Sequence, residues 1–359
     1  MSHNITIEGG TSVRLPTAGK YCDRDIIITA TGSADGGDGD ELARSIVDKT
    51  ITAYSDSEVT AVGAYSFVDC EKMTSVSVPS ATSIGNYAFS SSGALNSVNI
   101  PLVTSIGQYA FNACTALSTI KGETVTSLEG HAFTGCSALA LVDFPKLTTI
   151  GTYAFQNCTS LESFDGENVT TVQTYAFADC SALAEINLPK ATSVTGYAFL
   201  RTAIKHLSLP SLTSMGSSAF RGSIFETCDF PLVTNIGNNA FRAQTYIKSV
   251  TFPKVTSTAS ESMRNCSSLT YVDLPLCTSF GTYTFYDCSS LETLILRTTS
   301  KVCTMGNANV LTNTKIAAGT GYVYVPASMV DKYKATTGAW QTYKEQIRAI
   351  EDYPEITGG

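Results

Sequence analysis

Residues 83–104 read SIGNYAFSSSGALNSVNIPLVT, and residues 149–170 read TIGTYAFQNCTSLESFDGENVT. Both stretches carry Ile-Gly, Tyr-Ala-Phe, a later leucine and a closing Val-Thr at the same positions. The phenylalanine of this unit returns every 21 or 22 residues, with methionine once in its place: Phe67, Phe89, Phe111, Phe133, Phe155, Phe177, Phe199, Phe220, Phe241, Met263 and Phe285. Eleven such positions with a nearly constant period indicate a solenoid of stacked coils.

Within a repeat, the first part alternates apolar and polar residues, as Val98-Asn99-Ile100 does before Pro101. A period of two predicts a half-buried strand, and the proline ends it because proline has no backbone N–H. In the next apolar step we expect Gly107 to permit a tight bend. The Tyr-Ala-Phe-x-x-Cys piece is too short for a full helix and predicts a single helical or 3₁₀ turn. One coil cannot bury its apolar residues alone, so the coils must stack.

The repeats resemble the BspA-like class of bacterial leucine-rich repeats, whose pattern is close to IGxxAFxxCxxLxxIxIPxxVTx. The resemblance covers roughly residues 50 to 297. It implies an α/β-type solenoid with a parallel β-sheet on one face, short turns or 3₁₀ segments on the other, and caps at both ends. Thr202, Ser223 and Gln244 replace the cysteine of the pattern, and Met263 replaces its phenylalanine. These departures leave the fold prediction intact.

The chain divides into four predicted segments. Residues 1–31 read as a small β-rich amino-terminal module, and they resemble segments of prophage structural proteins of Gram-positive gut bacteria. Residues 32–40 form a Gly- and Asp-rich linker. Residues 41–297 are predicted to form the solenoid of about eleven 21–22-residue units, with a short helix at 41–55 covering its first coil. Residues 298–359 are predicted to form a carboxy-terminal cap with a strand and a helix, in which Trp340 packs.

Composition excludes several kinds of partner. The net charge is −8 and no cluster of Lys and Arg occurs, so we expect no nucleic-acid binding. No apolar run is long enough to span a bilayer, so we expect no membrane insertion. The first residues show no signal peptide. The expectation is a chain made in the cytoplasm that acts on a virion or a cell surface.

Seven of the eleven cysteines fall at one position of the repeat: Cys70, Cys114, Cys136, Cys158, Cys180, Cys266 and Cys288. A disulfide framework is typical of small chains without a core, and zinc sites need close cysteine pairs, which are missing here. We therefore interpret these cysteines as buried thiols that act as small apolar side chains.

The sequence predicts no catalytic residues, no metal ligands and no cofactor. There are three histidines: His3 at the amino terminus, His131 in a slot that other units fill with tyrosine, and His206 on the outward side of a strand. None converges with others as a metal site or a Ser-His-Asp arrangement requires. We expect a protein that is not an enzyme.

Two neighbouring outward columns on the strands predict a binding surface. Carboxylates and amides on a curved sheet suit hydrogen bonding to sugars or to basic protein patches. The alternative interpretation is an ordinary solvated face, which repeat proteins need. The residues predicted to bind are Asp143, Asp165, Asn187, Asp229, Tyr271 and Asp273.

Two functions follow as hypotheses, both based on non-covalent recognition of a protein or glycan on a cell surface. The first is a phage or prophage tail-associated or receptor-binding component, with residues 1–31 docking to other virion proteins. The second is a bacterial cell-surface adhesin of the BspA-like type, which binds host proteins or glycans. An intracellular scaffold is permitted by the sequence but has no positive support.

Overall fold

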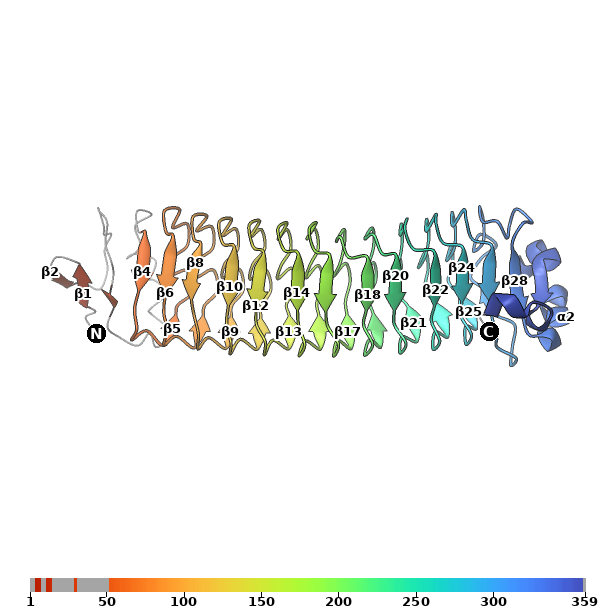
Figure 1. The fold of residues 1–359 in the computed structure, drawn as a ribbon, viewed down its shortest axis with the longest axis horizontal. Helices are drawn as coiled ribbons and strands as arrows, with labels where there is room; N and C mark the ends of the chain where they lie inside the picture. Colours follow the sequence, from red (N-terminus) through yellow and green to blue (C-terminus); the bar gives the residue numbers. More distant parts are fainter. Residues whose placement is uncertain (1–3, 8–10, 15–28, 31–51, 358–359) are drawn as a thin grey trace. The chain divides into compact units, whose positions relative to one another are not determined.

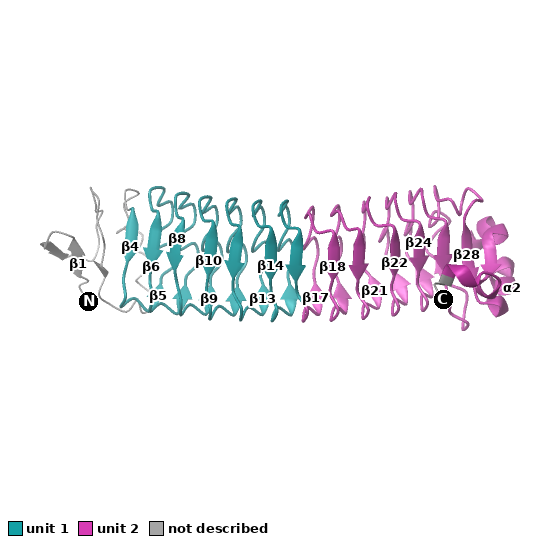
Figure 2. Cartoon of the chain, in the orientation of Figure 1, with its two compact units in different colours: residues 1–188 teal, residues 189–359 magenta. Residues whose placement is uncertain are grey.

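The computed structural model describes residues 4–7, 11–14, 29–30 and 52–357. The chain forms two compact units, Met1–Leu188 (unit 1) and Pro189–Gly359 (unit 2), which Figure 2 distinguishes by colour. The predicted linker at 32–40 lies outside the described residues. The prediction of a helix over residues 41–55 is wrong for its last three residues. Ala53–Ser55 forms the strand β4, which pairs with a strand of the next coil.

Unit 1 begins with a small antiparallel sheet and continues as parallel coils (Figure 1). The small sheet has the order β2-β1-β3, with β1 at Asn4–Ile7, β2 at Thr11–Arg14 and β3 at Thr29–Ala30. The coils carry three-residue strands: β4, β6 (Ser75–Ser77), β8 (Ser97–Asn99), β10 (Thr119–Lys121), β12 (Leu141–Asp143), β14 (Ser163–Asp165) and β16 (Glu185–Asn187). They also carry two-residue strands: β5 (Ala61–Val62), β7 (Ser83–Ile84), β9 (Ser105–Ile106), β11 (Ser127–Leu128), β13 (Thr149–Ile150) and β15 (Thr171–Val172).

Unit 2 repeats this arrangement. Its three-residue strands are β18 (His206–Ser208), β20 (Thr227–Asp229), β22 (Ser249–Thr251), β24 (Tyr271–Asp273) and β26 (Thr293–Ile295). Its two-residue strands are β17 (Ser193–Val194), β19 (Ser214–Met215), β21 (Asn235–Ile236), β23 (Ser257–Thr258), β25 (Ser279–Phe280) and β27 (Thr304–Met305). The end of the unit adds β28 (Tyr322–Val325), α2 (Ala327–Ala335), η1 (Ala339–Gln346), β29 (Ile347–Ala349), η2 (Ile350–Asp352) and η3 (Pro354–Thr357).

The strands of successive coils run parallel, and the register follows the repeat. Ser127 pairs with Ser105 before it and with Thr149 after it. Identical positions therefore pile up into columns. The phenylalanine column of unit 1, from Phe67 to Phe177, is buried, and neighbouring rings stack with centroids 5.1–5.5 Å apart. The predicted parallel solenoid is confirmed in each unit.

The Tyr-Ala-Phe side of the coil contains neither a helix nor a regular 3₁₀ segment, but a run of turns. Tyr109 and Ala113 have left-handed backbones, with φ of 56° and 55°, so a helix cannot continue through them. The N–H groups of Tyr109, Phe111 and Ala113 instead donate to carbonyls of the next coil, at 2.8–3.0 Å. In the described repeats this side is thus joined between coils by backbone hydrogen bonds, and the helix α2 comes only after the last coil.

Glycine at the bend serves close packing. Gly107 does not have a positive φ, and a Cβ built there would lie 2.6 Å from Asn86 Oδ1 and 2.9 Å from the Asn86 backbone nitrogen. The tight-bend explanation given for Gly107 is therefore wrong. Glycine is needed because the backbone of the preceding coil comes so near.

Candidate functional site

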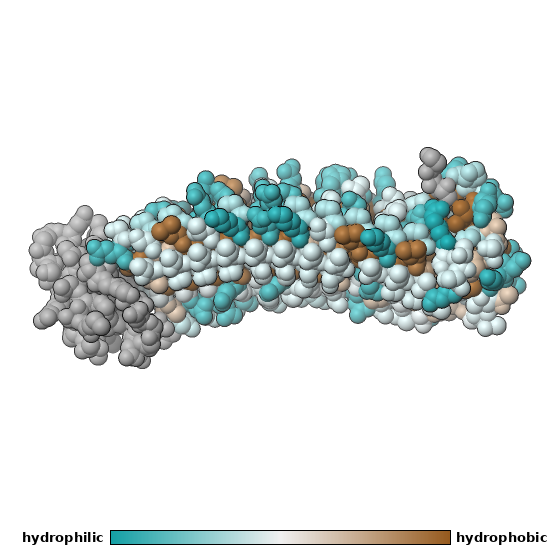
Figure 3. All heavy atoms as spheres, turned by 90° about the horizontal axis from the view of Figure 1, so that it is seen from below, coloured by the Kyte–Doolittle hydropathy of each residue, from teal (hydrophilic) through white to brown (hydrophobic). Residues whose placement is uncertain are grey.

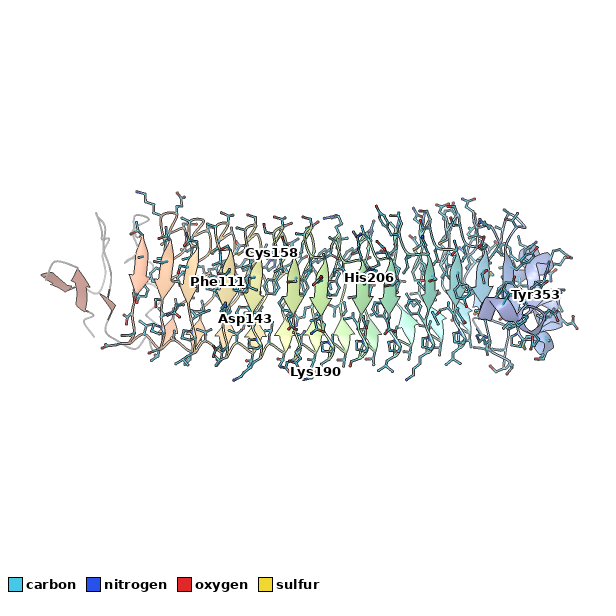
Figure 4. All side chains as sticks on the ribbon, in the orientation of Figure 1. Phe111, Asp143, Cys158, Lys190, His206 and Tyr353 are labelled. Atoms are coloured by element: carbon cyan, nitrogen blue, oxygen red, sulfur yellow. The ribbon has the colours of Figure 1, made fainter. Side chains whose placement is uncertain are left out.

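In unit 1 the predicted outward column lies where the sequence placed it. Asp143, Asp165 and Asn187 are the last residues of β12, β14 and β16, and all three side chains are exposed (Figure 4 labels Asp143). Asn187 is paired in register with Asp165, and its Nδ2 donates to Asp165 Oδ1 at 2.9 Å. Lys121, also exposed, is paired with Asp143. These groups form one polar ladder, hereafter the acidic ladder (Asp143, Asp165 and Asn187).

The first residues of the same strands form a second outward column beside the acidic ladder. Ser163 and Glu185 are exposed there, and Leu141 is an exposed apolar side chain with 44% of its surface accessible. Strands in one sheet are about 4.8 Å apart, so the two columns give a regular grid of hydrogen-bonding groups. A partner would meet hydroxyl, carboxylate and amide groups interrupted by one leucine.

In unit 2 the three predicted site residues differ in exposure. Asp229 is exposed on β20 and accepts a long hydrogen bond from Ser208 Oγ at 3.5 Å. Tyr271 is half-buried, and burial, followed by the charge of Asp273, raises its pKa. Asp273 itself is only 7% exposed.

The prediction that Asp273 belongs to an exposed face is therefore wrong. Its Oδ2 accepts a hydrogen bond from Arg297 Nη2 at 2.8 Å, and this bond to Asp273 raises the pKa of Arg297. The following members of the same column, Ile295 and Tyr324, are buried. The chain end packs on this part of the sheet, since the ring centroids of Tyr353 and Tyr324 lie 5.4 Å apart (Figure 4 labels Tyr353).

The two described histidines lie in different surroundings. His131 stacks between Tyr109 and Tyr153, with ring centroids 4.3 and 4.5 Å away, and burial lowers its pKa. His206 is exposed on β18, and its Nδ1 lies 2.9 Å from Thr227 Oγ1 (Figure 4). Over the described residues, no three side chains of His, Cys, Asp or Glu gather in a way that could hold a metal ion.

The cysteine column has a role that the sequence did not reveal. Cys114, Cys136 and Cys158 are fully buried, and each Sγ donates to the carbonyl of the phenylalanine in the preceding coil, at 3.0–3.2 Å. Ser92 makes the same bond to Phe67 at 2.8 Å, and Ser223 makes it to Phe199 at 2.6 Å. Interpreting these thiols as merely apolar was wrong, because this slot supplies a hydrogen-bond donor.

Burial also makes these thiols unreactive. It raises the pKa of Cys136 and of Cys180 to about 12, so both stay protonated at neutral pH. Thiolates are the reactive form, and a thiol in this state is a poor nucleophile. Cys136 and Cys180 therefore act as hydrogen-bond donors between coils.

A ladder of aromatic rings runs along the turn side of unit 1. Its centroids lie 4.3–4.9 Å apart and its planes are within 13° of parallel. Its members are half-buried: Tyr65, Tyr87, Tyr109, His131, Tyr153 and Tyr175. The repeat did place His131 in this column, but the stacking could not be foreseen, since it depends on the left-handed backbone of each member.

Outside these columns the surface is polar with scattered apolar residues. Figure 3 shows mostly teal or pale residues with small brown patches. The large exposed apolar side chains are Leu102, Leu141, Tyr246 and Leu276. In the part of the chain that the structure describes, no helix is long and apolar enough to cross a membrane.

The family model of the BspA type leucine-rich repeat region matches residues 49–124, 119–226 and 213–319. The chain belongs to the BspA-type leucine-rich repeat family. Repeat proteins of this kind use extended surfaces for binding, and this BspA-type chain has the same organisation. No curated protein matches it.

One solved structure supports the BspA-type fold. A leucine-rich repeat protein from Bacteroides ovatus is 21% identical, with a TM-score of 0.68 over 96% of this chain and 98% of that one. A leucine rich cell surface protein from Faecalibacterium prausnitzii is 18% identical, with a TM-score of 0.43 over 90% of this chain and 89% of that one. At these identities the likeness concerns the fold alone.

Proposed function

We propose that this BspA-type chain is a recognition protein that binds a protein or glycan on a cell surface through the acidic ladder of unit 1. The observation that carries the proposal is the exposed row of Asp143, Asp165 and Asn187 at the same position of three successive coils, with Asp165 and Asn187 paired in register. Because the strands hold these groups in fixed positions, binding costs little ordering of the site.

The acidic ladder suits a partner that donates hydrogen bonds. Asp165 Oδ1 already accepts from Asn187, while the remaining carboxylate oxygens on the exposed face are acceptors for sugar hydroxyls, lysine or arginine. The adjacent Leu141 adds an apolar contact of the kind that sugar rings and protein side chains both use. A bacterial surface adhesin is the function that this arrangement supports best.

The test compares two double variants of the full chain. Asp143→Ser/Asp165→Ser removes two carboxylates from the ladder, and Glu71→Ser/Glu129→Ser removes two exposed carboxylates from turns elsewhere in unit 1. On a glycan array and on cultured host cells, we expect the ladder variant to bind at least about tenfold more weakly, since each hydrogen bond to a charged group contributes about 1.5–3 kcal/mol. The control should bind like the parent chain.

Two results would contradict the proposal. One is a folded parent chain that binds no glycan and no cell surface. The other is a ladder variant that binds as well as the parent. If the ladder variant does bind more weakly than the parent, the target that loses binding, a glycan or a cell-surface protein, shows which of the two partner classes the ladder recognises.

The role in a phage or prophage tail stays a prediction that rests on residues 1–31. No comparison supports it. Mass spectrometry of purified virions that fails to find this chain would contradict it.

A further inference from the structure

Unit 2 carries three arginines at one repeat position on three consecutive coils. Arg221, Arg242 and Arg264 each follow the core residue of their coil. The backbone confirms the register, because Gly222 N–H donates to the Arg242 carbonyl at 3.2 Å and Ala243 N–H donates to the Arg264 carbonyl at 2.9 Å. The three side chains therefore leave the same face in one row, hereafter the arginine row.

Two members of the row are held in place by a carboxylate. Glu261 Oε2 accepts from Arg242 Nη1 at 2.7 Å and from Arg264 Nη1 at 3.2 Å. The guanidinium of Arg264 also lies over the ring of Tyr286, 4.9 Å from its centroid. Both arginine side chains still expose more than a quarter of their surface, at 29% and 28%. These guanidinium groups are fixed and remain open to solvent.

The positive charge of the row exceeds its compensation. The row has three arginines, of which Arg242 and Arg264 share Glu261, and no described residue forms an ion pair or side-chain hydrogen bond with Arg221. Arg264 Nε is buried without a hydrogen-bond partner. A row of like charges on neighbouring coils is unfavourable unless an anion shares it. The chain as a whole has a net charge of −8, so the arginine row is a local concentration of positive charge on an acidic protein.

We propose that the arginine row binds an anionic polysaccharide through its carboxylate or sulfate groups. Guanidinium groups bind such oxyanions with two parallel hydrogen bonds, which lysine cannot do. The site lies on the turn side of the coils and uses none of the residues of the acidic ladder. It is a second binding site, independent of the first.

The spacing of the row favours a polysaccharide over an acidic peptide. Equivalent side chains on adjacent coils are about 4.8 Å apart, which is close to the length of one sugar ring in a linear chain. In an extended peptide, side chains on one face recur at about 6.6 Å, so their carboxylates would fall out of step with the arginines. A linear chain of acidic sugars advances by nearly one coil spacing per residue, so its repeat can follow the row.

The experiment measures binding of the full chain to polygalacturonate and to dextran sulfate, with neutral dextran for comparison. Arg221→Gln removes a charge that makes no ion pair within the described structure, so the fold should persist. We expect about a tenfold loss of affinity for the anionic polymers, the effect of losing one charge-assisted contact. Arg221→Lys should recover part of it. Whichever of the two polymers binds more tightly identifies carboxylate or sulfate as the preferred group.

Lys254→Gln is the matched control, because it removes an exposed charge from a different turn of unit 2. It should leave affinity unchanged. The proposal is overturned if neither polymer binds, if neutral dextran binds equally, or if Lys254→Gln costs as much as Arg221→Gln. Single-stranded DNA binding as tightly as the polysaccharides would also overturn it, since the row would then respond to any polyanion.

Discussion

Unit 1 and unit 2 use one coil design but fill two of its positions differently. At the slot that follows the core phenylalanine by three residues, unit 1 has mainly cysteine, whereas unit 2 has Thr202, Ser223 and Gln244 on successive coils before cysteine returns at Cys266 and Cys288. The side chains of Ser223 and Gln244 donate to the carbonyls of Phe199 and Phe220, the same contact that the thiols of unit 1 make. At the tyrosine slot, unit 1 stacks aromatic rings, whereas unit 2 keeps tyrosine only at Tyr197 and Tyr283 and has Ser218, Asn239 and Glu261 on the three coils between them.

This difference separates structural from variable positions. Ser223 and Gln244 change the atoms of the donor slot and keep its hydrogen bond to the preceding coil, whereas the Thr202 hydroxyl donates to the Phe199 carbonyl of its own coil. The hydrogen bond to the preceding coil is thus kept through two changes of side chain, because a buried carbonyl needs a donor. The tyrosine slot changes its chemistry while the left-handed backbone stays, with φ of 56° at both Tyr109 and Glu261. Side chains there are free to specify a surface, and in unit 2 that freedom produces the carboxylate that holds two arginines.

Alkaline pH should expose the largest difference between the two kinds of donor. Burial raises the pKa of Cys136 and Cys180 to about 12, whereas an unfolded thiol ionises near about 8.5. Between these values the folded state holds protons that the unfolded state has lost, so stability is complete below pH ~8.5 and falls as pH rises toward ~12. Hydroxyl and amide donors such as Ser223 do not titrate in this range.

The measurement is the melting temperature by circular dichroism from pH 7.5 to 11, with reductant present. The double variant Cys136→Ser/Cys180→Ser keeps two donors and removes two titrating groups. Its melting temperature should fall less steeply with pH than that of the parent. Identical slopes would show that these thiols do not govern alkaline stability.

The tyrosine slot should show the smaller effect. His131→Tyr completes the ring ladder of unit 1, and we expect a gain of about 0.5–1 kcal/mol from better stacking. Because burial lowers the pKa of His131, the parent should lose stability as pH falls below ~6.5, and the variant should not. Urea denaturation at pH 7.5 and pH 5 measures both effects. A destabilised variant at both pH values would contradict this account of the ladder, and Tyr153→His is the reverse control.

Much of this fold could be predicted from the sequence, because each inward column repeats often enough to set the register. Phe111 belongs to a column that recurs every 21 or 22 residues, and Val98 belongs to an alternation of apolar and polar residues within the repeat. Stacked coils explain both patterns together. The turn side could not be predicted in detail. A left-handed tyrosine is rare, and no local propensity favours it; hydrogen bonds between neighbouring coils impose it.

The candidate site was only partly predictable for a similar reason. The alternation of strand residues placed Asp143 and Asp165 on the outside correctly. Asp273 follows the same pattern but is buried, because Arg297 and the chain end cover it, and these lie 24 or more residues away in sequence. The arginine row was visible as a repeat position, yet its partner Glu261 became apparent only in three dimensions.

The claim that the slot after the phenylalanine requires a donor is tested most directly by urea denaturation of Cys158→Ser and Cys158→Val. Serine keeps a donor for the Phe133 carbonyl, and valine fills the space without one. We expect the serine variant to unfold near the parent midpoint and the valine variant to lose about 1 kcal/mol. A valine variant as stable as the serine variant, or more stable, would contradict the claim and restore the purely apolar interpretation of the column.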